Sequence, residues 1–387
     1  MTIVVTGGGS GGHIMPILAV AAELKKQHPS VKIIYIGQRG DKLADIPAAD
    51  PHIDEVYAVR AGKFRRYHGE GFKQLLDLPT VFKNLRDGLY VLIGIIQSGL
   101  LIHRLQPSII FTRGGFVSVP VAFGGLLNRV PYITHDSDST PSLANRIIAR
   151  WAAKHAVALP TDVYPYPAAK TVTVGIPIDA EYQPVTPEKQ RAYRESLSIS
   201  AKQVVLVTGG GNGAQQLNNA MVANARQLLA HHPQLAIIHI TGRAHEADVV
   251  EAYKKVLPET AMHRVIIKDF ITDLYRYSGA ADVIIARGGA TNLAEFAAQG
   301  KACVIVPSEQ LAWTVKNMEV MGNRNAVRAL TVAQSEQEGR LGAAVAELLD
   351  DDNARTELAA NLASFAHPHA AKELAALILA EAKPEGS

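Results

Sequence analysis

The chain has 387 residues, of which 48% are hydrophobic and 19% charged, and its net charge is +3. This length exceeds one ordinary domain and suits two, and the low charge, with 20 prolines spread along the chain, excludes a disordered protein. A single cysteine excludes a disulfide framework. Cys303, in the apolar run KACVIVP, is predicted to be a buried strand residue rather than a catalytic thiol.

The amino-terminal sequence MTIVVTGG predicts a strand and not a signal peptide, so we expect the protein to stay in the cytoplasm. Charge is distributed unevenly along the chain. Residues 1–176 hold 19 Lys and Arg against 12 Asp and Glu, a balance of +7, and the remainder carries −4. A basic half joined to an acidic half indicates that one half meets an anionic partner.

Short β-branched runs alternate with helical patterns in both halves. Strands are predicted near 3–6, 32–36, 54–58, 109–112, 131–134, 155–158 and 171–174, and then near 203–207, 235–240, 264–267, 282–285 and 302–306. The turn-rich stretch IDAEYQPVTPEKQ at 178–190 is the predicted linker. The pattern predicts an α/β protein with two facing Rossmann-like domains, parallel sheets and an interdomain cleft.

Nearly the same glycine loop occurs twice, as VTGGGSGG at 5–12 and VTGGGNGA at 207–214. Each follows a predicted strand and precedes a predicted helix, near 13–26 and 214–229, so backbone N–H groups can face a phosphate or sugar. In dinucleotide-binding domains an acidic residue after the next strand hydrogen-bonds the ribose. Neither half has this acid, because Gln38, Arg39 and Arg243 stand there instead. We therefore predict one phosphate-cradling loop in each domain rather than two dehydrogenase sites.

The segment ARGGATNLAEFAAQG at 286–300 follows another predicted strand and begins a helix. One interpretation is a diphosphate site, in which Arg287 adds charge to the helix N-terminus and Glu295 accepts hydrogen bonds from a ribose diol. The other is an ordinary helix that is capped by Thr291 and carries Glu295 as a surface acid. The residues alone leave both interpretations open.

Five ordered motifs together resemble the MurG family of N-acetylglucosaminyltransferases, from the first strand to about residue 330. They are GGGSGGH at 7–13, AGKFRRY at 61–67, THDSDSTPSLANR at 134–146, GGGNGA at 209–214 and ARGGATNLAE at 286–295. The resemblance implies the GT-B fold, with an acceptor domain at 1–176, a UDP-sugar domain at 177–364 and a last helix near 365–385 that packs back on the first domain. It implies inverting transfer of N-acetylglucosamine from UDP-GlcNAc to the C4 hydroxyl of undecaprenyl-pyrophosphoryl-MurNAc-pentapeptide, without a cofactor, at the cytoplasmic face of the membrane.

The same resemblance assigns residues to each substrate. The implied donor-binding residues are Ser10, Gly11, Gly12, Gly211, Asn212, Gly213, Ile271, Arg287, Gly289, Ala290, Thr291, Glu295 and Thr314. The implied acceptor-binding residues are Gly9, Gly12, His13, Arg66 and His135.

The transfer requires a base for the acceptor hydroxyl, and His13, Asp136 and Asp138 are the candidates. The segment Asp136–Ser137–Asp138 is also a literal D-x-D, a metal motif of a different glycosyltransferase fold. In this position it matches the family's HESD-type segment instead, so we predict no metal site.

The sequence departs from the family pattern at several positions. His135–Asp136 replaces a His-Glu pair, GIPID at 175–179 lacks the Asn and Arg of GNPxR, and GGGNGA replaces GGSQGA. Trp313–Thr314 stands at a polar pair that reads the donor sugar in the family, which leaves the sugar open.

Residues 88–102 form an uncharged apolar run, GLYVLIGIIQSGLLI, which is shorter than the ~20 residues of a spanning helix. For most of the run we predict a buried helix of the first domain. The segment 60–104 has a charge balance of +5 with interleaved aromatic residues, which indicates an interfacial patch for an anionic membrane surface. Because no nucleic-acid-binding fold accompanies it, we predict no nucleic acid partner.

Two alternatives to the MurG-type transferase remain at this point. One is a related GT-B enzyme with another sugar or lipid acceptor, such as a diacylglycerol glycosyltransferase. The other is a non-catalytic or epimerase-like UDP-sugar binder.

Overall fold

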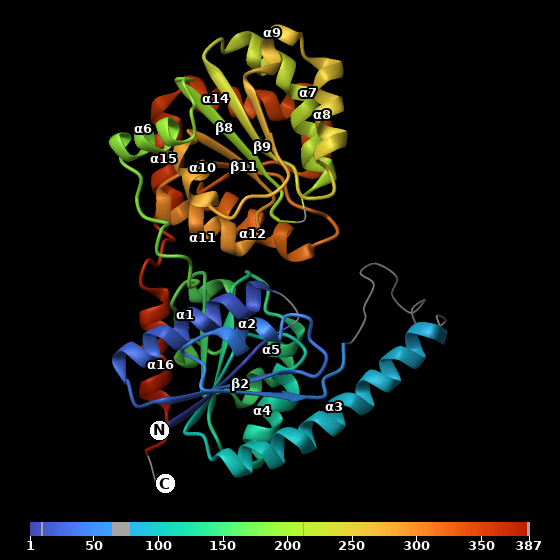
Figure 1. Ribbon diagram of the computed structural model, residues 1–387, viewed down its shortest axis with the longest axis vertical. Helices are drawn as coiled ribbons and strands as arrows, with labels where there is room; N and C mark the ends of the chain where they lie inside the picture. The colour runs from blue at the N-terminus through green and yellow to red at the C-terminus, as the bar shows by residue number, and fades with distance from the viewer. Residues whose placement is uncertain (9–10, 64–77, 212, 385–387) are drawn as a thin grey trace. The chain divides into compact units, whose positions relative to one another are not determined.

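The computed structural model describes residues 1–8, 11–63, 78–211 and 213–384. They cluster into two compact units (Figure 1). The first unit comprises Met1–Ser137, Pro141–Pro177 and His369–Ser387, and the second comprises Asp138–Thr140 and Ile178–Pro368.

The first unit is built around a parallel sheet of seven strands in the order β3-β2-β1-β4-β5-β6-β7. Its strands are β1 (Thr2–Thr6), β2 (Lys32–Gln38), β3 (Glu55–Val59), β4 (Ile109–Thr112), β5 (Tyr132–Asp136), β6 (Lys154–Val157) and β7 (Thr171–Thr173). Its helices are α1 (Gly11–Gln27), α2 (Asp45–Ala49), α3 (Leu78–Leu105), α4 (Ser118–Leu127), α5 (Leu143–Ile148) and α16 (Ala370–Glu381).

The second unit contains a parallel sheet of six strands in the order β10-β9-β8-β11-β12-β13. Its strands are β8 (Gln203–Thr208), β9 (Leu235–Ile240), β10 (Val265–Lys268), β11 (Val283–Ala286), β12 (Ala302–Ile305) and β13 (Arg328–Ala329). Its helices are α6 (Pro187–Ser196), α7 (Gln215–His231), α8 (Glu246–Val256), α9 (Glu259–Met262), α10 (Leu274–Ala280), α11 (Ala290–Gln299), α12 (Ala312–Gly322), α13 (Val332–Glu336), α14 (Arg340–Asp350) and α15 (Asp352–Ala363).

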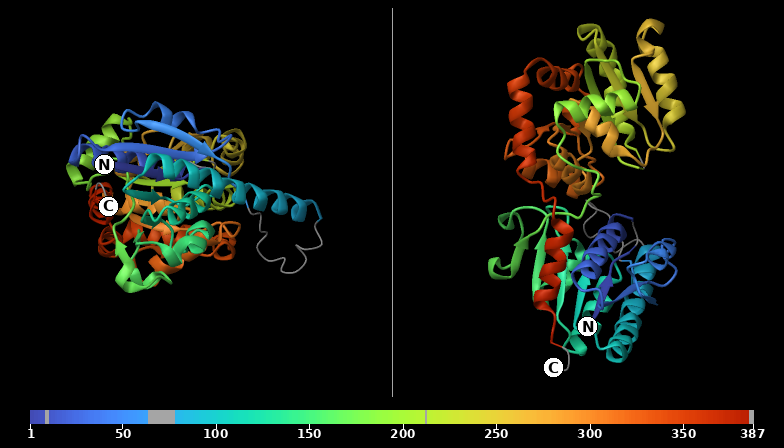
Figure 2. Two further views of the ribbon diagram at one scale, coloured as in Figure 1. Left: turned by 90° about the horizontal axis from the view of Figure 1, so that it is seen from below. Right: turned by 60° about the vertical axis from the view of Figure 1, so that its left-hand side comes forward.

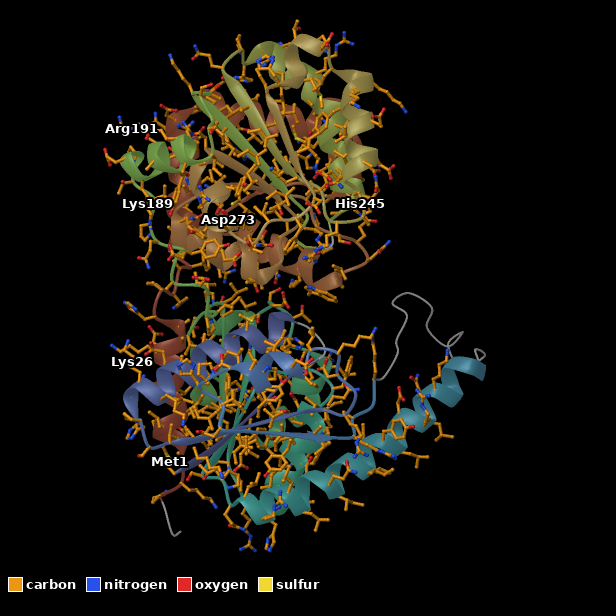
Figure 3. All side chains as sticks on the ribbon, viewed as in Figure 1. Met1, Lys26, Lys189, Arg191, His245 and Asp273 are labelled. Carbon is orange, nitrogen blue, oxygen red and sulfur yellow. The ribbon has the colours of Figure 1, made fainter. Side chains whose placement is uncertain are left out.

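In each sheet the strand order reverses next to the first strand of that unit, between β1 and β4 and between β8 and β11. Ligands of such sheets bind at this reversal, beyond the carboxyl ends of the strands. Each glycine loop follows the first strand and therefore lies at its own reversal point. In Figure 3, Met1 marks the opposite, amino end of β1, and His245 and Asp273 mark the loops that follow β9 and β10.

The inner strands of each sheet, such as β1, β4, β8 and β11, are almost fully buried because helices cover both faces. On one face of the first sheet α16 packs beside α1, and Leu374 and Ile378 join Ile3 and Val5 in one apolar cluster (Figures 1 and 2). The chain therefore returns to its first unit after completing the second.

The predicted fold class, with two Rossmann-like domains and parallel sheets, is confirmed, and the twelve predicted strands are present with ends shifted by up to two residues. The cleft between the domains stays a prediction. The sequence reading missed β13, which has only two residues. The predicted linker is too long, because α6 begins at Pro187, where Thr186 caps the helix by accepting a hydrogen bond from the Lys189 backbone N–H at 3.3 Å.

The prediction of a buried helix for most of 88–102 is wrong. These residues belong to α3, and only 17% of the apolar window within Lys83–Leu105 is buried. One seam of the helix packs closely on α4, because a Cβ on Gly94 would lie 3.0 Å from the Pro120 Cβ and one on Gly124 would lie 2.7 Å from the Ser98 Cβ. By length and composition alone, α3 is the one helix in the described part of the chain that could cross a membrane.

The opposite side of α3 carries a stripe of exposed apolar side chains. The spacing of three or four residues places them on one helical face, and their exposed fractions run from 55% to 69%. We call this surface the α3 stripe; it consists of Leu85, Leu89, Leu92, Ile96 and Leu100.

Candidate functional site

The first glycine loop joins β1 to α1, and side chains from neighbouring strands hold it. A Cβ on Gly7 would lie 2.9 Å from Ile17 and 3.2 Å from the Cβ of Arg113, so this turn needs glycine. The Tyr35 hydroxyl donates a hydrogen bond to the Gly7 carbonyl. Gly9 and Ser10 lie outside the described residues, and Gly11 and Gly12 begin α1.

His13 lies at the start of α1, and its Nδ1 is 2.9 Å from the carbonyl oxygen of Gly8. A carbonyl only accepts, so Nδ1 carries the proton and the lone pair of neutral His13 is on Nε2. Burial, with a smaller contribution from the charge of Arg113, holds the pKa of His13 below its ordinary value of 6.5. A neutral imidazole with its lone pair on Nε2 can take a proton from a hydroxyl group.

Arg113 is a residue that the sequence reading missed. It follows β4, is 3% exposed, and donates one hydrogen bond to the Gly12 carbonyl at 3.3 Å and others to His135 Nδ1 and Ser137 Oγ. The signal for it was a second internal repeat, TRGG at 112–115 and ARGG at 286–289. Arg113 thus joins the first glycine loop to the end of β5.

His135 is a structural link in this arrangement. Its Nδ1 accepts the bond from Arg113, so its Nε2 donates to the Gly175 carbonyl at 2.8 Å. Burial, with the charge of Arg113, holds the pKa of His135 well below 6.5. His135 is therefore neutral, with both ring nitrogens engaged.

Asp136 is also engaged inside its unit and is only 3% exposed. Its Oδ1 accepts from Asn145 Nδ2 at 2.9 Å and from the Ser142 backbone at 3.1 Å, and its Oδ2 accepts from the Tyr166 hydroxyl at 2.7 Å. Burial raises the pKa of Asp136, and these donors oppose that rise. These contacts indicate that Asp136 has a structural role and stabilises the end of β5.

Asp138 belongs to the second unit, where Asn317 of α12 holds its segment. Asn317 Nδ2 donates to Asp138 Oδ1 at 2.9 Å and to the Gly288 carbonyl at 3.1 Å, and its Oδ1 accepts from the Ser139 backbone at 2.8 Å. The role of Asn317 was not predicted. In the described parts of the chain, no group of three His, Cys, Asp or Glu side chains could hold a metal ion.

The second glycine loop joins β8 to α7 and is clamped by Arg287, which follows β11. Arg287 Nη1 donates to the Gly213 carbonyl at 3.2 Å. Gly210 and Gly213 have φ angles of +80° and +71°, which favour glycine. Gly211 lies against the ring of Phe270, since a Cβ on Gly211 would be 3.4 Å from that ring. Asn212 lies outside the described residues.

The N-terminus of α11 follows directly after this arginine, with Gly289 before the helix and Ala290 and Thr291 in its first turn. Among the described residues no side chain caps α11. The first N–H groups of the helix are therefore available to an anion, and Arg287, whose Nη1 bonds the Gly213 carbonyl, precedes them in the chain. The interpretation of Thr291 as the helix cap is wrong.

Glu295 lies one turn further along α11. Its Oε2 accepts from Asn292 Nδ2 at 2.8 Å, and Tyr182 is a second hydrogen-bond partner. Burial, opposed by these bonds, raises the pKa of Glu295 to about 7. Glu295 is thus a partly buried acceptor and not the surface acid of the alternative interpretation.

The remaining residues that were predicted to bind the sugar donor differ from one another in their environment. Ile271 follows β10 and is partly buried, beside Phe270, over whose ring the Arg243 guanidinium stacks at 3.7 Å. The Thr314 hydroxyl, in contrast, is bonded within its own turn, to Leu311 and Ser308. Trp313 is 41% exposed. Arg66 lies outside the described residues.

Two family models match the chain: the glycosyltransferase family 28 N-terminal domain over residues 3–157 and the family 28 C-terminal domain over residues 204–374. The chain is similar to a UDP-N-acetylglucosamine–N-acetylmuramyl-(pentapeptide) pyrophosphoryl-undecaprenol N-acetylglucosamine transferase of Bacillus licheniformis, with 30% identity over 97% of each chain.

Solved structures share the fold. A MurG from Acinetobacter baumannii has a TM-score of 0.76 and 22% identity, over 98% of this chain and 99% of that one. A UDP-GlcNAc 2-epimerase from Neisseria meningitidis, bound to UDP-GlcNAc, has a TM-score of 0.66 and 11% identity, over 98% of this chain and 100% of that one. Both likenesses concern the fold alone.

Proposed function

The chain belongs to the MurG family of UDP-N-acetylglucosamine–N-acetylmuramyl-(pentapeptide) pyrophosphoryl-undecaprenol N-acetylglucosamine transferases, and we propose its function from this membership. It is an inverting glycosyltransferase of the GT-B fold. It moves N-acetylglucosamine from UDP-GlcNAc to the C4 hydroxyl of undecaprenyl-pyrophosphoryl-MurNAc-pentapeptide, which converts lipid I to lipid II in peptidoglycan synthesis. The relative that aligns over 97% of this chain is the single observation that carries this conclusion.

The second unit supplies the donor site of the proposal. The uncapped N-terminus of α11 and Arg287 stabilise the negative charge that develops on the leaving UDP, and no metal ion or cofactor is assigned to the step. Glu295 accepts hydrogen bonds from the ribose diol, and the backbone of Ile271 meets the uracil. Gly211 and Gly213 supply the loop that approaches the diphosphate.

The first unit supplies the acceptor site and the base. As the acceptor O4 bonds to C1 of the sugar and the C1–O bond to UDP breaks, Nε2 of His13 takes the hydroxyl proton. Its bond to Gly8 and its lowered pKa support this assignment. Asp136 and His135 do not compete for the role in this proposal, because their polar atoms are engaged in bonds to their own unit.

A peripheral position on the cytoplasmic face of the membrane completes the proposal. The α3 stripe presents exposed apolar side chains on one face of a helix, whereas the opposite seam of α3 packs on α4. A helix with one apolar face lies in the membrane interface, with its axis along the surface. The lipid-linked acceptor would then reach the first unit from the bilayer.

The test of this function varies the acceptor. Purified protein, radiolabelled UDP-GlcNAc and lipid I in detergent should yield labelled lipid II, and diacylglycerol in place of lipid I should yield no labelled lipid. Label in diacylglycerol alone, or binding of UDP-GlcNAc with no turnover, would contradict the proposal in favour of a different transferase or a sugar-nucleotide binder.

A further inference from the structure

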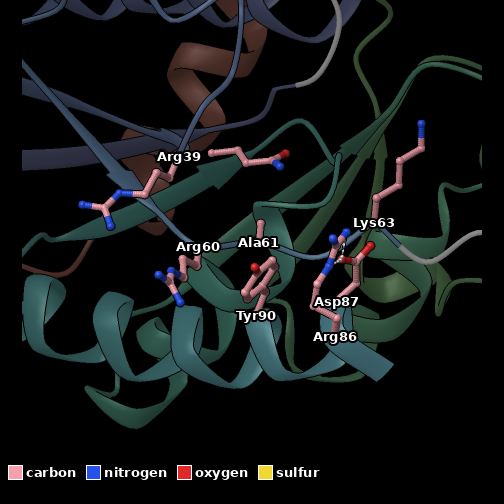
Figure 4. Close-up of a pocket in the computed structure, with 8 residues that line it drawn as sticks. Arg39, Arg60, Ala61, Lys63, Arg86, Asp87 and Tyr90 are labelled. Carbon is pink, nitrogen blue, oxygen red and sulfur yellow. Dashed lines mark hydrogen bonds and ion pairs between the residues drawn. The ribbon is translucent and has the colours of Figure 1, made fainter. Parts of the chain in front are cut away.

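Two acids that are shielded from water, one in each unit, are stabilised in different ways. In the first unit, Asp87 is 3% exposed and forms an ion pair with Arg86, whose Nε and Nη2 donate to Oδ1 at 3.2 and 3.1 Å (Figure 4). In the second unit, the hydrogen-bond partners of Glu295 are neutral: Asn292 donates to Oε2 at 2.8 Å, and Tyr182 is the other partner. A carboxylate that is held by neutral donors keeps its charge and its remaining lone pairs for a ligand.

Tyr182 belongs to the segment that enters the second unit, and this segment runs along α11. The second unit resumes at Ile178, shortly before Tyr182. Beyond the tyrosine, the Val185 backbone N–H donates to the Gln299 carbonyl at 3.3 Å. Because Gln299 lies about one helical turn after Glu295, the entering segment contacts α11 at two successive turns.

The ring of Tyr182 is fixed by its surroundings. It is 8% exposed, and its centre lies 6.2 Å from that of Tyr275 of α10, with the two rings nearly perpendicular. Gln299 Nε2 donates to the Tyr275 carbonyl at 2.7 Å, so α10 is in turn bonded to α11. Burial and the charge of the neighbouring Glu295 raise the pKa of Tyr182. The hydroxyl therefore keeps its proton at neutral pH and donates it to the carboxylate.

The charge state of Glu295 depends on these donors. Burial raises its pKa to about 7, the bonds from Asn292 and Tyr182 oppose that rise, and the negative charge of Asp179 adds to it. Without the Tyr182 hydroxyl, a larger share of Glu295 would be protonated at neutral pH. An ionised carboxylate accepts two hydroxyl donors through charge-assisted bonds, whereas a protonated carboxyl accepts more weakly.

We propose that Tyr182 is a positioning residue of the donor site, which holds the Glu295 carboxylate as the acceptor for both hydroxyl groups of the donor ribose. The inference rests on the proposed function for the assignment of Glu295 to the ribose. Tyr182 acts through Glu295 and does not itself contact the nucleotide. The segment that enters the second unit is thereby part of the donor site, although it precedes the second glycine loop in the chain.

The test measures ribose recognition in Tyr182→Phe and in the wild type, by calorimetry at pH 7 with UDP and with 2′,3′-dideoxy-UDP. A hydrogen bond to a charged group is worth about tenfold to a hundredfold in affinity, so the wild type should prefer UDP by at least about tenfold. In Tyr182→Phe this preference should fall by about fivefold or more. The affinity for the dideoxy ligand should stay close to that of the wild type, which also shows that the site is folded.

The matched control is Tyr193→Phe. It removes the same hydroxyl from a ring of α6 whose centre also lies 6.2 Å from that of Tyr275, and it should keep the wild-type preference for UDP.

A pH series supplies a readout that a change in packing alone would not move. The wild-type preference for UDP should fall as the pH drops below about 7, because protonation removes the charged acceptor. In Tyr182→Phe the same fall should occur at higher pH, since the lost hydrogen bond held the pKa of Glu295 down. The ratio of the two affinities cancels the titration of the diphosphate, which both ligands share.

Several outcomes would overturn the inference. Tyr182→Phe could keep the wild-type preference, lose affinity for both ligands by the same factor, or lose no more preference than Tyr193→Phe; each result would leave Tyr182 a packing residue. A wild-type protein that binds both ligands equally would also remove Glu295 from the ribose. Transfer of N-acetylglucosamine to lipid I is measured separately and tests the proposed function itself, so its failure is distinguishable from the failure of this inference.

Discussion

Nδ1 of His13 donates a hydrogen bond to the Gly8 carbonyl, and this one contact decides which ring nitrogen can act as a base. Among the three acids and bases proposed from the sequence, His13 alone couples a defined tautomer with a lowered pKa. Asp136 has three donors on its carboxylate, and Asp138 is held by Asn317.

Replacement of His13 by Gln should therefore affect turnover rather than donor binding. General-base catalysis is worth roughly a hundredfold to ten-thousandfold, so kcat should fall at least a hundredfold. Steady-state assays with lipid I measure kcat, and calorimetry with UDP-GlcNAc should give an unchanged Kd. A fall in kcat of less than tenfold would remove His13 from the role of base.

Arg113→Met tests the neighbour of that base. Removal of the guanidinium charge raises the pKa of His13, because burial and this charge both lower it in the wild type. The base must be neutral, so the acid limb of the profile of kcat/KM against pH should move to higher pH in the variant. An acid limb at the wild-type pH would show that Arg113 does not influence the base.

Tyr166→Phe tests the structural role of Asp136. The variant removes the hydroxyl that donates to Asp136 Oδ2 at 2.7 Å and leaves a buried carboxylate one donor short. We expect a loss of roughly 1–3 kcal/mol in the free energy of unfolding, measured with urea, and a kcat close to that of the wild type for the protein that remains folded. A large loss of kcat without a loss of stability would instead assign Asp136 to the chemistry.

Glu295→Gln tests the buried donor-site acid through stability. A carboxyl whose pKa rises from 4.5 to about 7 on folding favours its protonated form, so the folded state loses stability as the pH rises between those values. The loss corresponds to roughly 3 kcal/mol by pH 8. Urea denaturation should show Glu295→Gln more stable than the wild type at pH 8 and equal to it at pH 4. Equal stability at pH 8 would contradict the raised pKa.

Leu92→Glu/Ile96→Glu tests the α3 stripe. Both side chains are about 60% exposed, so the variant should keep the wild-type melting temperature. It should lose measurable binding to phosphatidylcholine vesicles, because each apolar side chain contributes roughly 1.5–3 kcal/mol on burial. Ile46→Glu, an exposed position on α2, is the control and should bind as the wild type does. Wild-type binding by the stripe variant would exclude this surface.

The strands and both glycine loops could be predicted because β-branched runs and glycine spacing are local signals. The environment of α3 could not be predicted from the sequence, because the pattern of apolar residues is the same whether another helix or a membrane covers them. Its small seam residues, Gly94 and Ser98, pack on α4 and turn the larger side chains outward. The engagement of Asp136 depends on Tyr166, thirty residues away, and no sequence spacing indicates such a contact. Arg113 was predictable in principle, from the repeated RGG after β4 and β11.

The central claim is that this chain adds N-acetylglucosamine to lipid-linked MurNAc, and a donor competition tests it most directly. Lipid I is incubated with the purified protein and equal concentrations of UDP-GlcNAc and UDP-glucose, and the product lipid is resolved by mass spectrometry. We expect a product that carries one added N-acetylhexosamine and almost no hexose, although Trp313 stands where the family resemblance implies a polar residue. A product that carries mainly hexose, or unchanged lipid I under conditions where UDP-GlcNAc binds, would contradict it.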